Sequence, residues 1–241
     1  MDAADDDGDE HWGSHELRSF GRRRGRKLSP RQSALMSDLL PRLAIDLGAP
    51  PPADARALIP GAVDEAWLEI GFGGAEHLLW QATQHPRVGI IGCEPFEEGV
   101  VKALAGIDGG GLAERVRLHA DDARPLLRWL PAASIARAFI LFPDPWPKRR
   151  HAKRRLVQPA LLAELARVMK PGAELRIGTD IGDYARTVLL AMRETPEFAW
   201  IATGPADWRV RPDDWPSTRY EQKGLREGRR CYYLRFVLGA S

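Results

Sequence analysis

The stretch Trp67-Leu68-Glu69-Ile70-Gly71-Phe72-Gly73-Gly74-Ala75-Glu76 decides the fold class of this chain. It has the pattern of a buried strand that ends in a glycine-rich turn, and the residues after the turn predict a helix over 75–84. A strand, turn and helix of this kind begin a βαβ unit, and the turn can approach a ligand closely because glycine has no Cβ. A tight connection without any ligand is the alternative interpretation.

Short apolar segments and helical segments alternate along the rest of the chain. Strands are predicted over 66–72, 88–94, 116–120, 136–142, 174–179, 198–203 and 231–238, and helices over 75–84, 96–105, 123–129, 159–170 and 183–194. This alternation predicts an α/β fold with a seven-stranded, mainly parallel sheet and helices on both faces. Since such sheets bind ligands beyond the carboxyl ends of their strands, the residues just after each strand are the candidates for a site.

Composition and organisation narrow the class of protein. Of the 241 residues, 44% are hydrophobic and 28% are charged, as in globular proteins, and no apolar run approaches the roughly 18 residues of a membrane span. With only Cys93 and Cys231, a reducing, cytosolic compartment is expected. Residues 1–27 are predicted to be a disordered acidic tail with a basic arm, and 28–241 a folded domain whose first helix starts at Ser29-Pro30.

The net charge of +2 conceals an asymmetry. Residues 1–17 hold seven acidic residues and no Lys or Arg, so residues 18–241 carry +9. The basic side chains of these residues cluster in two stretches, 18–31 and 148–155. Two such clusters can follow a phosphate backbone and favour a polyanionic partner, whereas a mildly basic surface that serves solubility is the alternative.

The acids that follow the first two strands favour one class of cofactor. Glu94 ends the second strand, 21 residues after Gly73, where a carboxylate can accept both hydroxyls of an adenosine ribose. A dinucleotide fingerprint would need glycine at Glu76, so NAD is disfavoured. The spacing from Glu69 through Gly71, Gly73 and Ala75 instead resembles motif I of the S-adenosylmethionine-dependent methyltransferases, in which Glu69 would face the amino-acid end of the cofactor.

The third strand is followed by Asp121-Asp122-Ala123. A carboxylate at this place could accept a hydrogen bond from an adenine amino group, and Asp122 is favoured over Asp121 because it directly precedes Ala123. The alternative for either residue is an N-cap of the helix that begins near Ala123.

The fourth strand runs into Phe142-Pro143-Asp144-Pro145-Trp146-Pro147-Lys148. Three prolines spaced two apart stiffen the loop, so that Asp144 and Lys148 point in fixed directions. An acid, an aromatic residue and the basic run that follows are typical of a site for a nucleotide base. Among the tryptophans, Trp146, Trp208 and Trp215 lie in proline-rich loops and are the candidates for stacking on a base, whereas Trp67, Trp80 and Trp129 are expected in the core.

From these residues the chain resembles the bacterial TrmB-type tRNA (guanine-N7)-methyltransferases. The resemblance rests on 142–148, on His151-Ala152-Lys153-Arg154-Arg155, on Thr179-Asp180, on 218–224 and on a basic N-terminal motif, and it extends over about 17–238. Two departures from the family pattern are Ala75, where a third glycine is frequent, and Cys93-Glu94-Pro95-Phe96 around the ribose acid.

The resemblance implies a Rossmann-like class I fold, S-adenosyl-L-methionine as cofactor, and transfer of its methyl group to guanine N7 in the variable loop of tRNA. It implies a catalytic and orienting role for Asp144, and cofactor binding by Glu69, Gly71, Gly73, Glu94, Asp122 and Asp144. It implies substrate binding by Lys148, Asp180, Thr218, Arg219, Tyr220 and Glu221, though an N-cap at Asp180 and a surface loop at 218–221 are the alternatives. A methyltransferase for another RNA or a small molecule, and an inactive tRNA-binding module, are the rival functions.

The chemistry of this reaction requires neither metal nor general base. Guanine N7 already carries a free lone pair, so catalysis should come from alignment of the methyl group and from a carboxylate near the base as its positive charge develops. No zinc-binding spacing links the six histidines and two cysteines. The number of subunits stays open.

Overall fold

The computed structural model describes residues 23–239. Of the predicted tail and basic arm, residues 1–22 lie outside the described residues. Residues 23–27 are described: the guanidinium of Arg23 pairs with Asp121 at 2.7 Å, and its carbonyl accepts from the amide of Glu97 at 3.0 Å.

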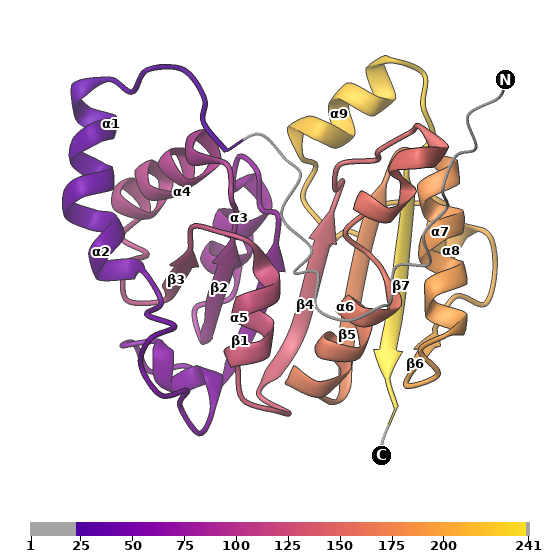
Figure 1. Ribbon diagram of the computed structural model, residues 1–241, viewed down its shortest axis with the longest axis horizontal. Helices are drawn as coiled ribbons and strands as arrows, with labels where there is room; N and C mark the ends of the chain where they lie inside the picture. The colour runs from indigo at the N-terminus through magenta and orange to yellow at the C-terminus, as the bar shows by residue number, and fades with distance from the viewer. Residues whose placement is uncertain (1–22, 240–241) are drawn as a thin grey trace, which may run out of the picture.

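One seven-stranded sheet organises the described chain (Figure 1). Its strands are β1 Glu65–Ile70, β2 Val88–Cys93, β3 Val116–His119, β4 Ile135–Leu141, β5 Met169–Thr179, β6 Phe198–Trp200 and β7 Tyr232–Leu238, in the order β3-β2-β1-β4-β5-β7-β6. The first five strands are parallel, β7 runs antiparallel to β5, and β6 pairs antiparallel with β7 at the edge. The predicted mainly parallel sheet of seven strands is thus confirmed.

Helices cover both faces of this sheet (Figure 1). They are α1 Pro30–Ala34, η1 Leu35–Leu39, α2 Leu40–Leu43, η2 Ala55–Leu58, α3 Glu76–Gln84, α4 Glu97–Gly110, α5 Ala123–Trp129, η3 Arg149–Arg154, α6 Pro159–Val168, α7 Gly182–Arg193, α8 Ala206–Arg209 and α9 Arg219–Arg226. Apolar side chains of α5, α6 and α7 join one core cluster, and those of η1, α2, α3 and α4 join the other. The two clusters meet the two faces of β1 and β4 because side chains alternate along a strand.

The helix predicted to start at Ser29-Pro30 forms, with a change of winding in the middle. Ser29 and Gln32 make a reciprocal capping box, which satisfies free amides at the start of α1. The segment η1 is a π-helical turn. Pro41 explains this, because proline has no N–H to bond the carbonyl one α-helical turn earlier.

The boundary between the helix predicted over 159–170 and the strand predicted over 174–179 was wrong. The helix α6 ends at Val168, and β5 starts at Met169, so Lys170, Pro171 and Gly172 lie inside the strand. The pairing with β4 shifts between Ile135 and Arg137, and Gly172 has a φ of 79°, so the extra residues form an irregularity in the strand.

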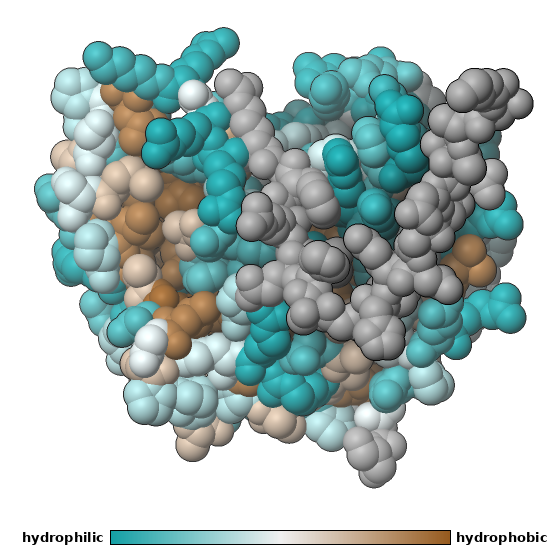
Figure 2. All heavy atoms as spheres, in the orientation of Figure 1, coloured by the Kyte–Doolittle hydropathy of each residue, from teal (hydrophilic) through white to brown (hydrophobic). Residues whose placement is uncertain are grey.

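The upper edge of the face drawn in Figure 2, over α9, is predominantly hydrophilic. This helix lies beyond the carboxyl end of β4 (Figure 1), at the edge of the sheet where the candidate residues were expected.

Candidate cofactor and base site

A cleft of about 320 Å³ lies at the carboxyl ends of β1, β2 and β4. Its lining includes Gly71, Gly73, Glu94, Asp122, Asp144 and Tyr220. These residues come from three strand ends, from the start of α5 and from the first turn of α9. The cleft has the size usual for small-molecule sites, and five of the six cofactor positions proposed from the sequence line it.

The glycine turn after β1 has the conformation that its residues permit. Gly71 and Gly73 have φ values of 74° and 54°, in the left-handed region that favours glycine. At Gly73 an added Cβ would stand 2.9 Å from the ring of Tyr220, so a larger residue would have to displace that ring. Ala75 has a φ of 63° as well, at a cost of about 1–2 kcal/mol for a residue other than glycine. Ala75 thus adopts the left-handed conformation that a glycine would favour at this position.

Glu94 is bonded to the glycine turn. Its Oε2 accepts from the amide of Gly73 at 2.8 Å and its Oε1 from the amide of Phe96 at 2.9 Å. The residue is only 7% exposed, and this burial raises the pKa of the carboxyl group although the two amides oppose the shift. The negative charge of Asp144 raises that pKa further. Free lone pairs on the two oxygens can accept hydrogen bonds from a ligand in the cleft.

Gly99, in the first turn of α4, makes this arrangement possible. A Cβ at Gly99 would lie 2.4 Å from the carbonyl oxygen of Gly73 and 3.0 Å from Cγ of Glu94. The helix therefore packs directly on the glycine turn. Sequence reasoning missed Gly99; the only signal was a glycine in the interior of a predicted helix, where it costs stability unless close packing requires it.

Asp122 lines the cleft, and Asp121 is not among its lining residues. Asp122 also caps α5: it accepts from the amide of Arg124 at 2.9 Å and pairs with that guanidinium at 2.8 Å. Asp121 instead accepts from the amide of Asp122 and from Arg23. The geometry thus favours Asp122 over Asp121 for a ligand contact. Asp122 both caps α5 and lines the cleft, so the two interpretations do not exclude each other.

Glu69 lies below the turn and is not part of the cleft lining. It is 2% exposed, and its Oε2 is 2.7 Å from Nδ1 of His77 on α3. Because neighbouring residues of a strand alternate, Ile70 lines the cleft while Glu69 points to the opposite face.

The loop after β4 is strained and firmly held. Phe142 and Trp146 have φ values of 51° and 41°, and such left-handed residues persist only where the surroundings enforce them. The amide of Phe142 donates to Gly178 at 2.7 Å. Arg155 donates to the carbonyl of Pro145 at 3.1 Å and also binds Asp183 and Thr187. This loop presents Asp144 as an exposed side chain at the cleft.

Two expectations for the basic run need correction or refinement. Arg155, which we counted in a phosphate-binding cluster, is only 4% exposed and serves to hold the loop. Lys148 is exposed at the N-cap of η3 and is not part of the cleft lining. Trp146 and Arg154 do line the cleft, with the guanidinium 5.1 Å from the centre of the ring.

Five of the six expected substrate residues lie at or against α9. Thr218 and Glu221 form a capping box at its start, and Glu221, 1% exposed, also accepts from the hydroxyl of Tyr233. Asp180 pairs with Arg229 at 2.7 Å and lies against Gly224 of the helix. The alternatives to substrate binding were an N-cap at Asp180 and a surface loop at 218–221. Asp180 does not cap α7, whose N-cap is Ile181, and residues 218–221 form the start of a helix instead of a loop.

Of the remaining two residues of that set, Tyr220 stands on the cleft side of α9, and Arg219 is not among the residues that line the cleft. Tyr220 is 43% exposed and lines the cleft, and Arg219 lies 3.5 Å from Glu76 at the start of α3. The α9 helix therefore forms a wall of the cleft opposite the glycine turn.

Of the three tryptophans proposed for stacking, one was assigned wrongly. Trp215 is wholly buried, with its ring near Tyr233 and Gly178, and cannot stack on a base. Trp208 stacks on Tyr232 at a ring distance of 5.9 Å, outside the cleft, whereas Trp146 lines it.

Across residues 23–239, no group of three or more His, Cys, Asp or Glu side chains is placed to hold a metal ion. In the same part of the chain, no helix has the length and apolar character needed to cross a membrane. Both cysteines are free thiols and buried.

Comparison with solved structures agrees with the fold. The crystal structure of the 16S rRNA methyltransferase KamB superimposes with a TM-score of 0.55, covering 75% of this chain and 91% of that one at 13% identity. The [4+2]-cyclase SpnF superimposes with a TM-score of 0.51, covering 89% and 84% at 15% identity. The fold is thus that of the Rossmann-like class I methyltransferases, and the cyclase shows that this fold alone does not define a reaction.

Sequence comparison identifies the family. A family model described as "Putative methyltransferase" matches residues 64–234. A tRNA (guanine-N(7)-)-methyltransferase of Rhodopseudomonas palustris is 49% identical over 92% of this chain and 88% of its own. The protein of that name from Hyphomonas neptunium is 54% identical over 87% of this chain and 94% of its own. The chain therefore belongs to the family of S-adenosylmethionine-dependent tRNA (guanine-N(7)-)-methyltransferases.

Proposed function

We propose that this protein transfers a methyl group from S-adenosyl-L-methionine to N7 of a guanine in the variable loop of tRNA. The single observation that carries the proposal is the convergence of Glu94, Asp122 and Asp144 on one cleft beside the glycine turn. The names of the relatives, which align over most of their length, supply the substrate class.

The residues of the cleft fit this cofactor. Because Gly73 has no Cβ, the space between its backbone and the ring of Tyr220 stays free for a ligand. The buried carboxylate of Glu94 is suited to accept hydrogen bonds from ribose hydroxyls. Asp122 is placed to accept from an adenine amino group. The acidic lining suits a ligand with an ammonium group and a sulfonium, and it would repel a pyrophosphate.

When bound, S-adenosyl-L-methionine supplies an electrophilic methyl group on a positively charged sulfur. Asp144, held in place by the strained loop, acts as the carboxylate beside the base: it orients the guanine and stabilises the positive charge that the ring gains. Trp146 and Tyr220 offer aromatic surfaces at the same cleft. Since N7 has no proton to lose, none of these residues has to act as a general base.

The exposed basic residues of the 148–155 run and of α9 flank the cleft on the side of the substrate. Lys148, Arg150 and Lys153 are exposed in and before η3, and Lys223 and Arg226 are exposed on α9. We infer that these side chains contact tRNA phosphates, while Arg219 and Tyr220 lie nearer to the base.

The test is incubation of the purified protein with methyl-labelled cofactor and an unmodified tRNA transcript, followed by nucleoside analysis. The proposal predicts label in N7-methylguanosine, and none in a transcript whose variable-loop guanine is replaced by adenine. Asp144→Asn should lower turnover by about 100-fold or more, because a positioned charge is lost. Asp108→Asn, at an exposed site on α4, is the control and should leave turnover unchanged. Label in any other nucleoside would overturn the proposal.

A further inference from the structure

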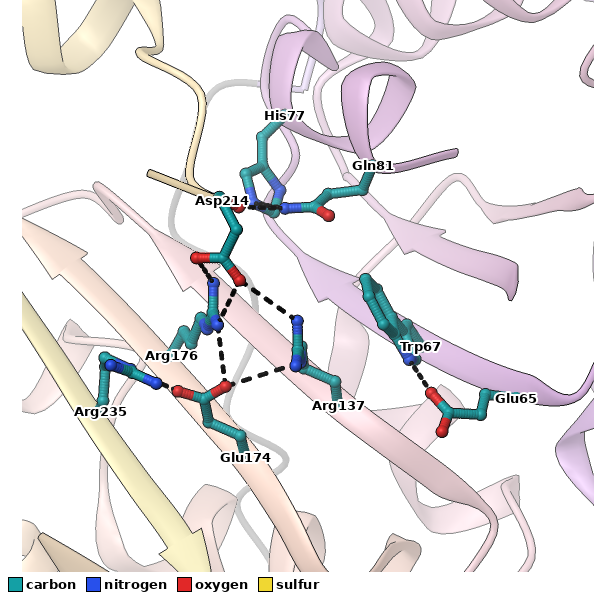
Figure 3. Close-up of polar contacts among 9 residues, drawn as sticks. All are labelled: Glu65, Trp67, His77, Gln81, Arg137, Glu174, Arg176, Asp214 and Arg235. Atoms are coloured by element: carbon teal, nitrogen blue, oxygen red, sulfur yellow. Dashed lines mark hydrogen bonds and ion pairs between the residues drawn. The ribbon is translucent and has the colours of Figure 1, made fainter. Parts of the chain in front are cut away.

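The segment that leads into α9 is bound to two different elements of the fold through Asp214 (Figure 3). The carboxylate of Asp214 accepts two parallel hydrogen bonds from Arg176 on β5, at 2.9 and 2.8 Å. Its carbonyl oxygen accepts from Nε2 of Gln81 on α3 at 3.0 Å. Asp214, in the segment before α9, thus links β5 to α3, the helix that follows the glycine turn.

The bond from Gln81 is part of a buried chain whose direction is determined. The carbonyl of Asp214 can only accept, so Gln81 must present its NH₂ group there. The second hydrogen of that group points to Nε2 of His77, 3.1 Å away, which therefore accepts. Nδ1 of His77 then donates to Glu69 at 2.7 Å. Glu69, His77 and Gln81 are each at most 2% exposed, so these bonds are shielded from water.

On the other side of the anchor the guanidinium of Arg176 is buried, whereas the side chain of Asp214 is 46% exposed. Arg176 is 2% exposed and its second carboxylate partner is Glu174, at 2.9 Å. Arg137 lies 3.7 Å from Asp214, and Arg235 bonds Glu174 (Figure 3). The guanidinium of Arg176 lowers the pKa of Asp214, so the anchor is ionised at neutral pH. A bidentate pair of this kind defines orientation as well as distance.

What the anchor holds in place is the wall of the cleft. Trp215, the next residue, is wholly buried, and its Cζ2 would lie 3.1 Å from a Cβ on Gly178. Three residues later Thr218 caps α9, and the ring of Tyr220 then reaches to within 2.9 Å of the Cβ position of Gly73. The chain therefore has little freedom between Asp214 and the side chain that faces the glycine turn.

We propose that Asp214 and Gln81 are positioning residues for methyl transfer, which hold the segment before α9 so that Tyr220 stands across the cleft from the glycine turn. The inference rests on the proposed function. Loss of either anchor should displace the wall of the cleft while Glu94 and the glycine turn, which β1, β2 and α4 hold, remain in place. The rate of methyl transfer should therefore fall by a larger factor than the affinity for the cofactor.

The variants are Asp214→Asn and Gln81→Met, and Glu174→Gln is the matched control. Glu174→Gln removes the other carboxylate partner of the same buried arginine, yet Glu174 makes no contact with the segment before α9 in the bonds described above. All three should lower the melting temperature. Asp214→Asn and Gln81→Met should lower the single-turnover rate at saturating cofactor and tRNA by about 10-fold or more, since small displacements are costly in an aligned transfer. Glu174→Gln should keep that rate near the wild-type value.

A second measurement does not depend on activity. Amide hydrogen exchange of residues 210–222 in the ligand-free protein should become faster in Asp214→Asn and Gln81→Met than in Glu174→Gln. Wild-type rates in the first two variants, or an equal loss in all three that follows their melting temperatures, would overturn the proposal. If the wild-type protein forms no N7-methylguanosine, the proposed function fails, and the exchange pattern still decides whether Asp214 and Gln81 anchor the segment.

Discussion

At the scale of single residues, the absence of a side chain at Gly99 shapes the cofactor site. Gly99→Ala would place a Cβ 2.4 Å from the carbonyl oxygen of Gly73, and backbone cannot move aside as a flexible side chain can. We expect the glycine turn or α4 to shift, at a cost of about 1–3 kcal/mol, with cofactor affinity measured by calorimetry falling about tenfold.

Gly109→Ala is the control in the same helix, since nothing lies within 4 Å of its Cβ position. This variant should bind cofactor as the wild type does and gain up to about 1 kcal/mol of stability from helix propensity. Equal affinities for Gly99→Ala and Gly109→Ala would show that α4 does not position the turn.

Burial of Glu94 leads to a prediction about pH. The ionised carboxylate is the form that accepts ribose hydroxyls, and burial raises the pKa of Glu94 above its ordinary range. Cofactor affinity should therefore fall as the pH drops through that raised pKa, at a higher pH than an ordinary glutamate would give. Calorimetric titrations from neutral into acidic pH measure this. Glu94→Gln should bind weakly throughout and lack this step, and an identical pH profile in both proteins would contradict the assignment.

The residues of the site were predictable to different degrees. Glu94, Asp122 and Asp144 could be found because each follows a strand whose end lies at the same edge of the sheet. Strand alternation puts Glu69 and Ile70 on opposite faces of β1, but the sequence does not show which of the two faces borders the cleft. Trp215 and Arg155 could not be assigned in this way, because a proline-rich loop and a basic run do not reveal which of their side chains become buried.

At the scale of elements, strands were predicted more successfully than the ends of helices. The buried parallel strands are short apolar runs between turn residues, a signal that tertiary structure seldom overrides. Residues 170–172 were misassigned because proline followed by glycine is typical of a helix stop, and only pairing with β4 shows that they belong to β5. We expected α4 to end at Ala105, yet it continues through Gly106 to Gly110. Gly106 lies inside the helix, where a Cβ would stand 2.2 Å from the side chain of Leu79.

The α9 helix was not predicted at all. It has only eight residues and is mostly polar, so no apolar periodicity distinguishes it from a loop. Its one local signal is the capping box, Thr218 followed three residues later by Glu221. That signal was available in the sequence, but the same residues were interpreted as substrate-binding residues, with a surface loop as the alternative.

At the scale of the whole molecule, the order of strands and helices along the chain predicts which segments reach the cleft. It does not predict contacts between side chains that are far apart in the sequence. Gln81 and Asp214 are 133 positions apart, and their hydrogen bond depends on how α3 and the segment before α9 pack on the two neighbouring parts of the sheet. The same holds for Arg155, which binds Asp183 across the start of α7.

The central claim is that carboxyl groups at successive strand ends bind S-adenosyl-L-methionine in the cleft beside Asp144. A crystal structure of the protein with S-adenosylhomocysteine tests it most directly. We predict that the ribose hydroxyls contact Glu94, that the adenine amino group contacts Asp122, and that the sulfur faces Asp144. A ligand bound away from Glu94 and the glycine turn, or bound there without contact to these carboxyl groups, would contradict the account.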